Sequence, residues 1–170
     1  MSDYYQRINQ TEKALQVLQS IPDEDIEFSE VILDRLLLLH QKLGSEEELI
    51  NYLYRIISLG AGASSVVLLS KLIAQFRSVE KAQAFMLQEL RRNPTMKGFN
   101  QLMTYHLTLS EAENEAESLS FLQKLVAEQI KLRPKYRCQK CGYSSNKLFW
   151  LCPSCKSWGR IKPIRGLDGE

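Results

Sequence analysis

Apolar residues recur at intervals of three and four along residues 2–134, the spacing of helices that bury one face. Glycine and proline are sparse here and fall between the apolar runs. The pattern predicts a helix over residues 3–20 and then five more, marked by these positions: Ile32, Leu36 and Leu39; Leu49, Leu53 and Ile56; Val66, Leu69 and Ile73; Ala82, Met86 and Leu90; Leu102, Tyr105 and Leu109.

Local signals predict where these helices start and stop. Gly44 suits the position just after a helix, and Ser45-Glu-Glu-Glu48 has the form of a capping box that opens the next one. Asn93-Pro94 closes a later helix. Ser110 can cap a final helix of about twenty residues that Pro134 ends, acidic at its start and basic at its end as the helix dipole favours.

The helices pair, and the pairs repeat. First helices of successive pairs are predicted to begin near Ser29, Ala63 and Met96, a period near 34 that is typical of tetratricopeptide repeats. Ala82 and Pro94 fit the end of that motif, but the large aromatic residue and glycine of its first helix are missing. Residues 1–134 are therefore predicted to be degenerate tetratricopeptide-like repeats, with HEAT-like or generic helical hairpins as alternatives.

Four cysteines follow, and the chain has no others: Cys138, Cys141, Cys152 and Cys155. Two CxxC turns that face each other can place four sulfurs around one tetrahedral ion, Zn²⁺ or a single iron. Disulfides would need an oxidising compartment, and a thioredoxin-type CxxC would not occur twice within so short a segment. Residues 135–170 are therefore predicted to be a rubredoxin-like or zinc-ribbon module with these four ligands.

The module is too small to fold on apolar burial alone, so we expect metal binding to be coupled to its folding. Short strands are predicted over Lys135–Cys138 and Lys147–Cys152. We expect the tail Ile161–Gly169 to run back over the repeats. Four aromatic residues either pack around the cage and against the last helix or face a partner: Tyr143, Phe149, Trp150 and Trp158.

Charge separates the two parts of the chain. Residues 135–170 hold eight Lys/Arg against two Asp/Glu, a net charge of +6, whereas the remainder carries −4. The basic module could pack on the acidic body or attract an acidic partner. No apolar run reaches the length of a membrane span, and reduced cysteines favour the cytosol.

The sequence argues against an enzyme. His40 and His106 each lie in an apolar helical stretch, and the glutamates at 111–117 read as a charge bias at a helix start. There is no GxSxG, phosphate-binding glycine loop or HExxH motif. Four cysteine ligands would also leave the metal no open position for a substrate water. No catalytic residue is predicted, and no cofactor besides the metal.

Three segments together resemble the C-terminal end of the lipopolysaccharide assembly protein B family: Tyr136–Tyr143; Leu148–Cys155 with Trp158; and Ile161–Gly169. The last segment is the most specific, because no generic zinc ribbon requires it. Members of this family are tetratricopeptide proteins with a C-terminal rubredoxin-like domain, further repeats and an N-terminal membrane anchor. The resemblance implies that the present chain is a fragment, in agreement with its start inside a helix-like stretch.

The resemblance also implies a function. The family is a non-enzymatic adaptor at the cytoplasmic face of the inner membrane, which promotes proteolysis of the deacetylase that commits carbon to lipid A. A membrane-anchored AAA+ protease degrades that enzyme, and an inner-membrane regulator that senses lipopolysaccharide restrains the adaptor. In the family the metal module packs against the repeats and its cysteines are needed, a requirement that carries over to Cys138, Cys141, Cys152 and Cys155.

Two other functions remain open from the residues alone. A rubredoxin-type electron carrier could use an iron bound by four sulfurs, and a nucleic-acid-binding zinc ribbon would suit the basic tail. Against the second, Arg160, Lys162 and Arg165 lie in one short segment rather than along a recognition helix. The sequence does not distinguish zinc from iron, nor does it assign the partner-binding face of the repeats or the oligomeric state.

Overall fold

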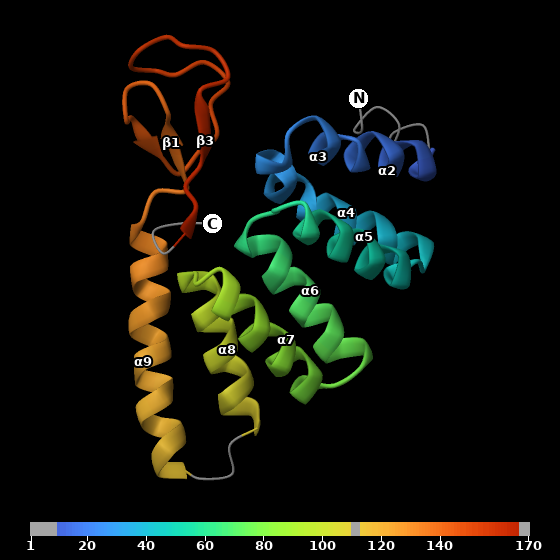
Figure 1. Cartoon of the computed structure of the whole chain (residues 1–170), viewed down its shortest axis with the longest axis vertical. Helices are drawn as coiled ribbons and strands as arrows, with labels where there is room; N and C mark the ends of the chain where they lie inside the picture. The colour runs from blue at the N-terminus through green and yellow to red at the C-terminus, as the bar shows by residue number, and fades with distance from the viewer. Residues whose placement is uncertain (1–9, 110–112, 167–170) are drawn as a thin grey trace. The chain divides into compact units, whose positions relative to one another are not determined.

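Helices fill the described chain up to Leu132, and a small three-stranded sheet follows (Figure 1). The computed structural model describes residues 10–109 and 113–166, without the side chains of residues 113–118. The helices are α2 (Thr11–Gln19), α3 (Ile21–Glu24), α4 (Ser29–Leu43), α5 (Glu46–Ser58), α6 (Ala63–Phe76), α7 (Val79–Arg92), α8 (Met96–Leu109) and α9 (Glu113–Leu132), with a 3-10 turn, η1 (Ile26–Phe28). The strands are β1 (Tyr136–Cys138), β2 (Ser144–Ser145) and β3 (Ile161–Pro163).

This architecture confirms the predicted fold class, an all-α array of helical hairpins followed by a small C-terminal strand module that holds the four cysteines. The first helices of the pairs begin at Ser29, Ala63 and Met96, as the period predicted. Within the described ranges, none of the helices has the length and apolar character that crossing a bilayer requires. The predicted Ser110 cap lies outside the described residues.

The chain forms two compact units, Met1–Leu69 and Ser70–Glu170, and the division falls within α6. In the first unit α2 packs on α4, and α4 packs on α5. In the second unit α8 packs against both α7 and α9. The boundary predicted after residue 134 marks the change from helix to strand and stays a prediction.

Each unit has an apolar core drawn from the predicted helix faces. In the first, Leu36 of α4 is fully buried with Leu49, Leu53 and Ile56 of α5. In the second, the buried hydroxyl of Tyr105 in α8 donates a hydrogen bond to Ser70 Oγ in α6 at 3.0 Å. This bond satisfies both buried hydroxyls, which would otherwise cost free energy to desolvate.

The turn between α4 and α5 differs from the predicted capping box. Gly44 has the left-handed conformation expected after a helix, with φ of 64°. Ser45 precedes α5, but its hydroxyl makes no cap to that helix. It lies instead 2.8 Å from Nδ1 of His40, which is also 3.0 Å from the Ser45 carbonyl oxygen. The buried histidine therefore replaces the capping box as the interaction that fixes this turn.

His40 is held in its neutral form. Its side chain is fully buried, and Nε2 has no hydrogen-bond partner, so a proton there would be buried without an acceptor. Burial lowers the pKa of His40, and the Ser45 carbonyl and the charges of Glu48 and Glu46 oppose this effect only in part. The predicted role of a structural helix-face histidine fits this environment.

The small sheet has the order β2-β1-β3, with both pairs antiparallel. Ile161–Pro163, the start of the tail that is expected to run over the repeats, pairs with β1, opposite Tyr136–Cys138. The packing of the tail on the repeats stays a prediction. Pro163 is tolerated because β3 is an edge strand. The predicted strand over Lys147–Cys152 is wrong, because in that segment only Leu151 makes a bridge, to Trp158.

Substitution of His40 tests whether this side chain is buried in its neutral form. A base with a depressed pKa in the fold contributes stability that is complete above the unfolded pKa, near 6.5, and is lost as the pH falls below that value. Between about pH 7.5 and about pH 5, the free energy of unfolding of the parent should therefore fall more than that of His40→Gln. Denaturant titration measures both. Parallel curves of unfolding free energy against pH for the parent and His40→Gln would contradict the account.

Candidate metal centre

The two CxxC pairs lie in turns with the same backbone hydrogen bonds. In the first turn, Gly142 N–H donates to the carbonyl of Cys138 at 2.9 Å, and Cys138 N–H donates to that of Tyr143 at 2.8 Å. In the second, Lys156 N–H donates to the carbonyl of Cys152, and Cys152 N–H to that of Ser157, each at 3.0 Å. The repeated pattern holds both cysteines of each turn on the inner side of a tight loop.

Both turns place the residue after the second cysteine in the left-handed region. Gly142 has φ of 78° and Lys156 has φ of 57°. Glycine adopts this conformation without a steric penalty, whereas a residue with a Cβ atom pays about 1 kcal/mol. The first turn has the favoured residue, and the second turn keeps the same geometry in spite of Lys156.

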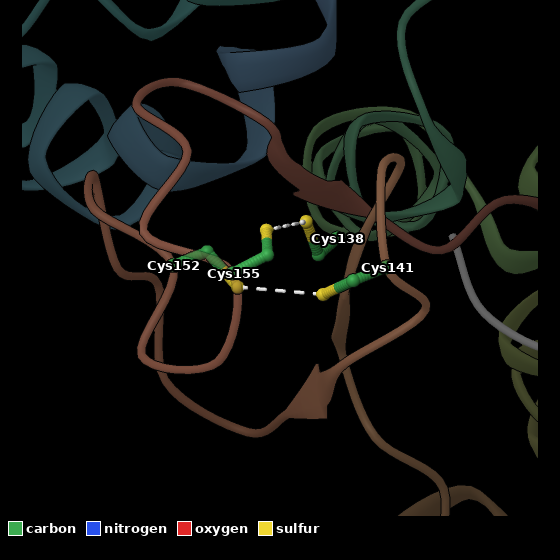
Figure 2. A group of neighbouring side chains, drawn as sticks. All are labelled: Cys138, Cys141, Cys152 and Cys155. Carbon is green, nitrogen blue, oxygen red and sulfur yellow. Dashed lines mark hydrogen bonds between the residues drawn. The ribbon is translucent and has the colours of Figure 1, made fainter.

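The four sulfurs converge between the two turns (Figure 2). Sγ of Cys138 lies 3.8 Å from Sγ of Cys155, and Sγ of Cys141 lies 3.7 Å from Sγ of Cys152. All four lie within 4.8 Å of one another. A tetrahedral ion with metal–sulfur bonds of about 2.3 Å separates its sulfurs by about 3.8 Å, whereas a disulfide bond measures about 2.0 Å. The spacing fits one ion coordinated by four sulfurs and excludes disulfides.

The first cysteine of each pair is buried and the second is more exposed. Cys138 and Cys152 are 1% and 0% exposed, and with Ile161 they form the core of the module. Cys141 is exposed and Cys155 partly so. Ile161 was not predicted as a core residue, because a three-residue segment that ends in proline carries only a weak strand signal. A metal would therefore be fixed from the core and reached from the side of Cys141.

The thiols differ in their readiness to ionise. The backbone N–H of Cys141 is the main cause that lowers the pKa of Cys138. Ser157, by its hydroxyl first and its backbone N–H second, lowers the pKa of Cys155 to about 6. Burial raises the pKa of Cys152 to about 11. The fold thus stabilises two of the thiolates, while Cys152 needs a bound cation to lose its proton at neutral pH.

The donor set leaves no coordination site for substrate chemistry at the metal. Four thiolates complete a tetrahedral shell, so no position remains for a water or substrate. The histidines, which were also considered as catalytic residues, lie outside the metal centre. His40 is part of the helical core, and His106 is exposed on α8, where its ring nitrogens are each 3.1 Å from Nε2 of Gln83. The side chains of the glutamates at 111–117 lie outside the description.

The aromatic residues of the module divide between its core and its surface. Tyr143 packs against the buried cysteines, as do Tyr136 and Leu148. Trp150 and Trp158 are 53% and 72% exposed. Packing around the cage therefore accounts for Tyr143 but not for the tryptophans.

Removal of a thiol should disrupt the module. We expect Cys155→Ser or Cys138→Ser to lose the metal and to unfold residues 135–166, because metal binding supplies most of the folding free energy of so small a unit. Elemental analysis and limited proteolysis would measure both effects. Ser154→Ala, which keeps the backbone of the same turn, is the matched control. Full metal content and unchanged protease resistance in Cys155→Ser would refute the assignment.

The left-handed positions predict opposite effects of two substitutions. Lys156→Gly should relieve about 1 kcal/mol of backbone strain, and Gly142→Ala should introduce a similar amount. Because folding and metal binding are coupled, the apparent metal affinity should rise about fivefold in the first and fall about fivefold in the second. Competition with a chromogenic chelator measures both changes. Equal affinities in the two variants would show that the turn geometry contributes nothing.

Comparison with known proteins agrees with this geometry. Residues 136–163 match the family described as the rubredoxin metal-binding domain. Over 157 residues, 92% of this chain, the sequence is 40% identical to lipopolysaccharide assembly protein B of Escherichia coli strain K12. Over 155 residues, 91% of the chain, it is 32% identical to the protein of the same name from Haemophilus influenzae. The chain spans about 40% of the length of these curated relatives. The resemblance over residues 136–169 is confirmed: this chain is similar to lipopolysaccharide assembly protein B over nearly all of its own length.

Proposed function

We propose that this protein is a non-enzymatic adaptor in the regulation of lipopolysaccharide biosynthesis. The observation that carries the proposal is the 40% identity to lipopolysaccharide assembly protein B over 92% of the chain, helices and metal module together. The names of these relatives describe assembly of lipopolysaccharide rather than an enzymatic reaction. Helical hairpins and a closed four-sulfur cluster, without an open metal position, suit a protein that binds other proteins.

In this proposal the four cysteines ligate one structural ion, zinc or iron, and the ion keeps residues 135–170 folded. Their sulfur spacing suits either metal, because both form tetrahedral sites with four sulfurs. The helical repeats of residues 1–134 supply the surface that binds partners. The tail of the module packs back on these repeats, so that the metal also stabilises the end of the helical array.

The partners follow from the family resemblance. The adaptor presents the lipid A deacetylase to a membrane-anchored AAA+ protease and thereby limits lipopolysaccharide synthesis. A lipopolysaccharide-sensing regulator in the inner membrane restrains it. The full-length protein acts at the cytoplasmic face of that membrane through an N-terminal anchor. No nucleic acid is a partner in this scheme.

A capture experiment tests the adaptor function. Immobilised, metal-loaded protein is incubated with purified lipid A deacetylase and, separately, with the detergent-solubilised protease. We expect specific retention of at least one of them, abolished by Cys155→Ser and preserved by Ser154→Ala, because the ion keeps the module folded. If folded, metal-loaded protein retains neither partner, the proposal fails for this part of the chain. Equal retention by Cys155→Ser would separate partner binding from the metal module.

A further inference from the structure

The second cysteine turn is the tip of a short ribbon with apolar arms. Leu151 and Trp158 form an antiparallel bridge, and Gly159 N–H donates to the carbonyl of Trp150 at 2.7 Å. Directly opposed residues of antiparallel segments point to the same face, so Leu151 and Trp158 share one. Phe149, Trp150, Leu151 and Trp158 are each more than one third exposed. A 32-residue module in which four large apolar side chains are partly exposed to solvent has a surface suited to a binding role.

The segment that contains this ribbon is rich in cations. Residues 135–166 contain eight Lys/Arg and no Asp or Glu. Four thiolates around a divalent ion remove two of these charges, so the segment keeps a net charge near +6. This excess attracts an anionic partner, and no carboxylate within the segment competes for the cations.

Two of the cationic residues line one open hollow beside the ribbon. This hollow has a volume of about 260 Å³ and is lined by Gln139, Lys140 and Arg160. Gln139 N–H donates to the carbonyl of Arg160 at 2.8 Å, which ties the first cysteine turn to the end of the ribbon. Within the described part of the chain, neither Lys140 nor Arg160 forms an ion pair. A lysine and an arginine that line the same hollow supply donors suited to a phosphate.

We propose that this aromatic–basic surface, formed by Phe149, Trp150, Leu151, Trp158, Lys140 and Arg160, binds the surface of a membrane that contains anionic phospholipid. Lys140 and Arg160 contact a headgroup phosphate. The tryptophans lie at the headgroup level, where amphipathic rings are most stable. Basic residues next to a bilayer are each attracted to anionic lipid, and exposed apolar side chains add insertion at the acyl boundary.

The composition of the ribbon favours a bilayer over single-stranded nucleic acid. A nucleic-acid surface places aromatic rings along a basic groove so that successive bases stack on them. Here the apolar residues are consecutive in Phe149-Trp-Leu151, and Leu151, which has no aromatic face, is 47% exposed beside Trp158. An aliphatic side chain contributes to insertion into lipid but not to base stacking.

The chain offers a direct reporter of this contact, because Trp150 and Trp158 are its only tryptophans. Metal-loaded protein is mixed with vesicles of phosphatidylcholine alone or of phosphatidylcholine with phosphatidylglycerol. With the anionic vesicles, tryptophan emission should shift to shorter wavelength and be quenched by brominated acyl chains. Both effects should weaken as the salt concentration rises.

Variants assign the contact to individual residues. In vesicle sedimentation, Lys140→Glu/Arg160→Glu should weaken binding about thirtyfold or more, whereas Lys71→Glu/Lys81→Glu, with the same change in net charge, should be far less affected. Trp150→Ser/Trp158→Ser should also reduce binding. Its control is Leu38→Ser/Leu59→Ser, which removes similarly exposed apolar side chains from α4 and from the end of α5. Vesicle binding is compared among variants that each hold one equivalent of metal. If Trp150→Ser/Trp158→Ser loses its ion, the single variant Trp158→Ser replaces it in the comparison.

Three outcomes would overturn the proposal. One is the absence of binding to anionic vesicles by metal-loaded protein. Another is vesicle binding without a change in tryptophan emission, which would place the contact elsewhere. The third is quenching by polyuridylate or by an acidic polypeptide with no response to vesicles, which would assign the surface to another class of partner. The inference goes beyond the adaptor function, and capture of the deacetylase is measured without vesicles, so either proposal can fail alone.

Discussion

Convergence of four thiolates is the interaction on which the C-terminal module depends. The core of the module is small: Cys138, Cys152 and Ile161 are buried in it, and Tyr136, Tyr143 and Leu148 pack partly buried against them. A sheet of three very short strands would not stay folded unaided. A cation resolves this weakness, because it removes the cost of buried thiolates and crosslinks two turns that ten residues separate. The apolar side chains that such a module would otherwise bury are then free to face outward.

The helical part depends on a different constraint, the packing of neighbouring helices within each unit. The repeat period and the apolar spacing predict this part well. Buried positions such as Leu36, Leu53 and Met86 belong to the three- and four-residue spacing within their helices, and this spacing hardly depends on distant contacts. The predicted capping box at Ser45 does not form, because a contact with His40 takes the place of the local hydrogen bond. Ser45 has the sequence neighbours of a capping residue, but its hydroxyl contacts the buried ring of His40 and makes no hydrogen bond to the exposed start of α5. Sequence spacing alone does not reveal that competition.

For the metal centre, the identity and spacing of Cys138, Cys141, Cys152 and Cys155 were sufficient to predict the cluster, because CxxC turns carry their geometry locally. Strand pairing was less predictable. Ile161–Pro163 pairs with β1 across more than twenty residues, and a segment of three residues with a proline has no strong strand signal. Hydrophobic arms around Trp150 resemble a strand in sequence, yet they form only a single bridge and remain exposed. Whether an aromatic residue packs inward or faces a partner depends on the space beside the four-sulfur cage. The amino-acid composition does not reveal that space.

Metal chemistry and surface chemistry are therefore linked in this chain: the ion folds the module, and the folded module displays a basic, aromatic surface. The central claim is that one ion is bound by all four cysteines. X-ray absorption at the zinc and iron edges of the purified protein tests it most directly and identifies the metal. The account predicts a single metal with four sulfur neighbours at about 2.3 Å. A shell with fewer than four sulfurs, or with nitrogen or oxygen ligands, would contradict it.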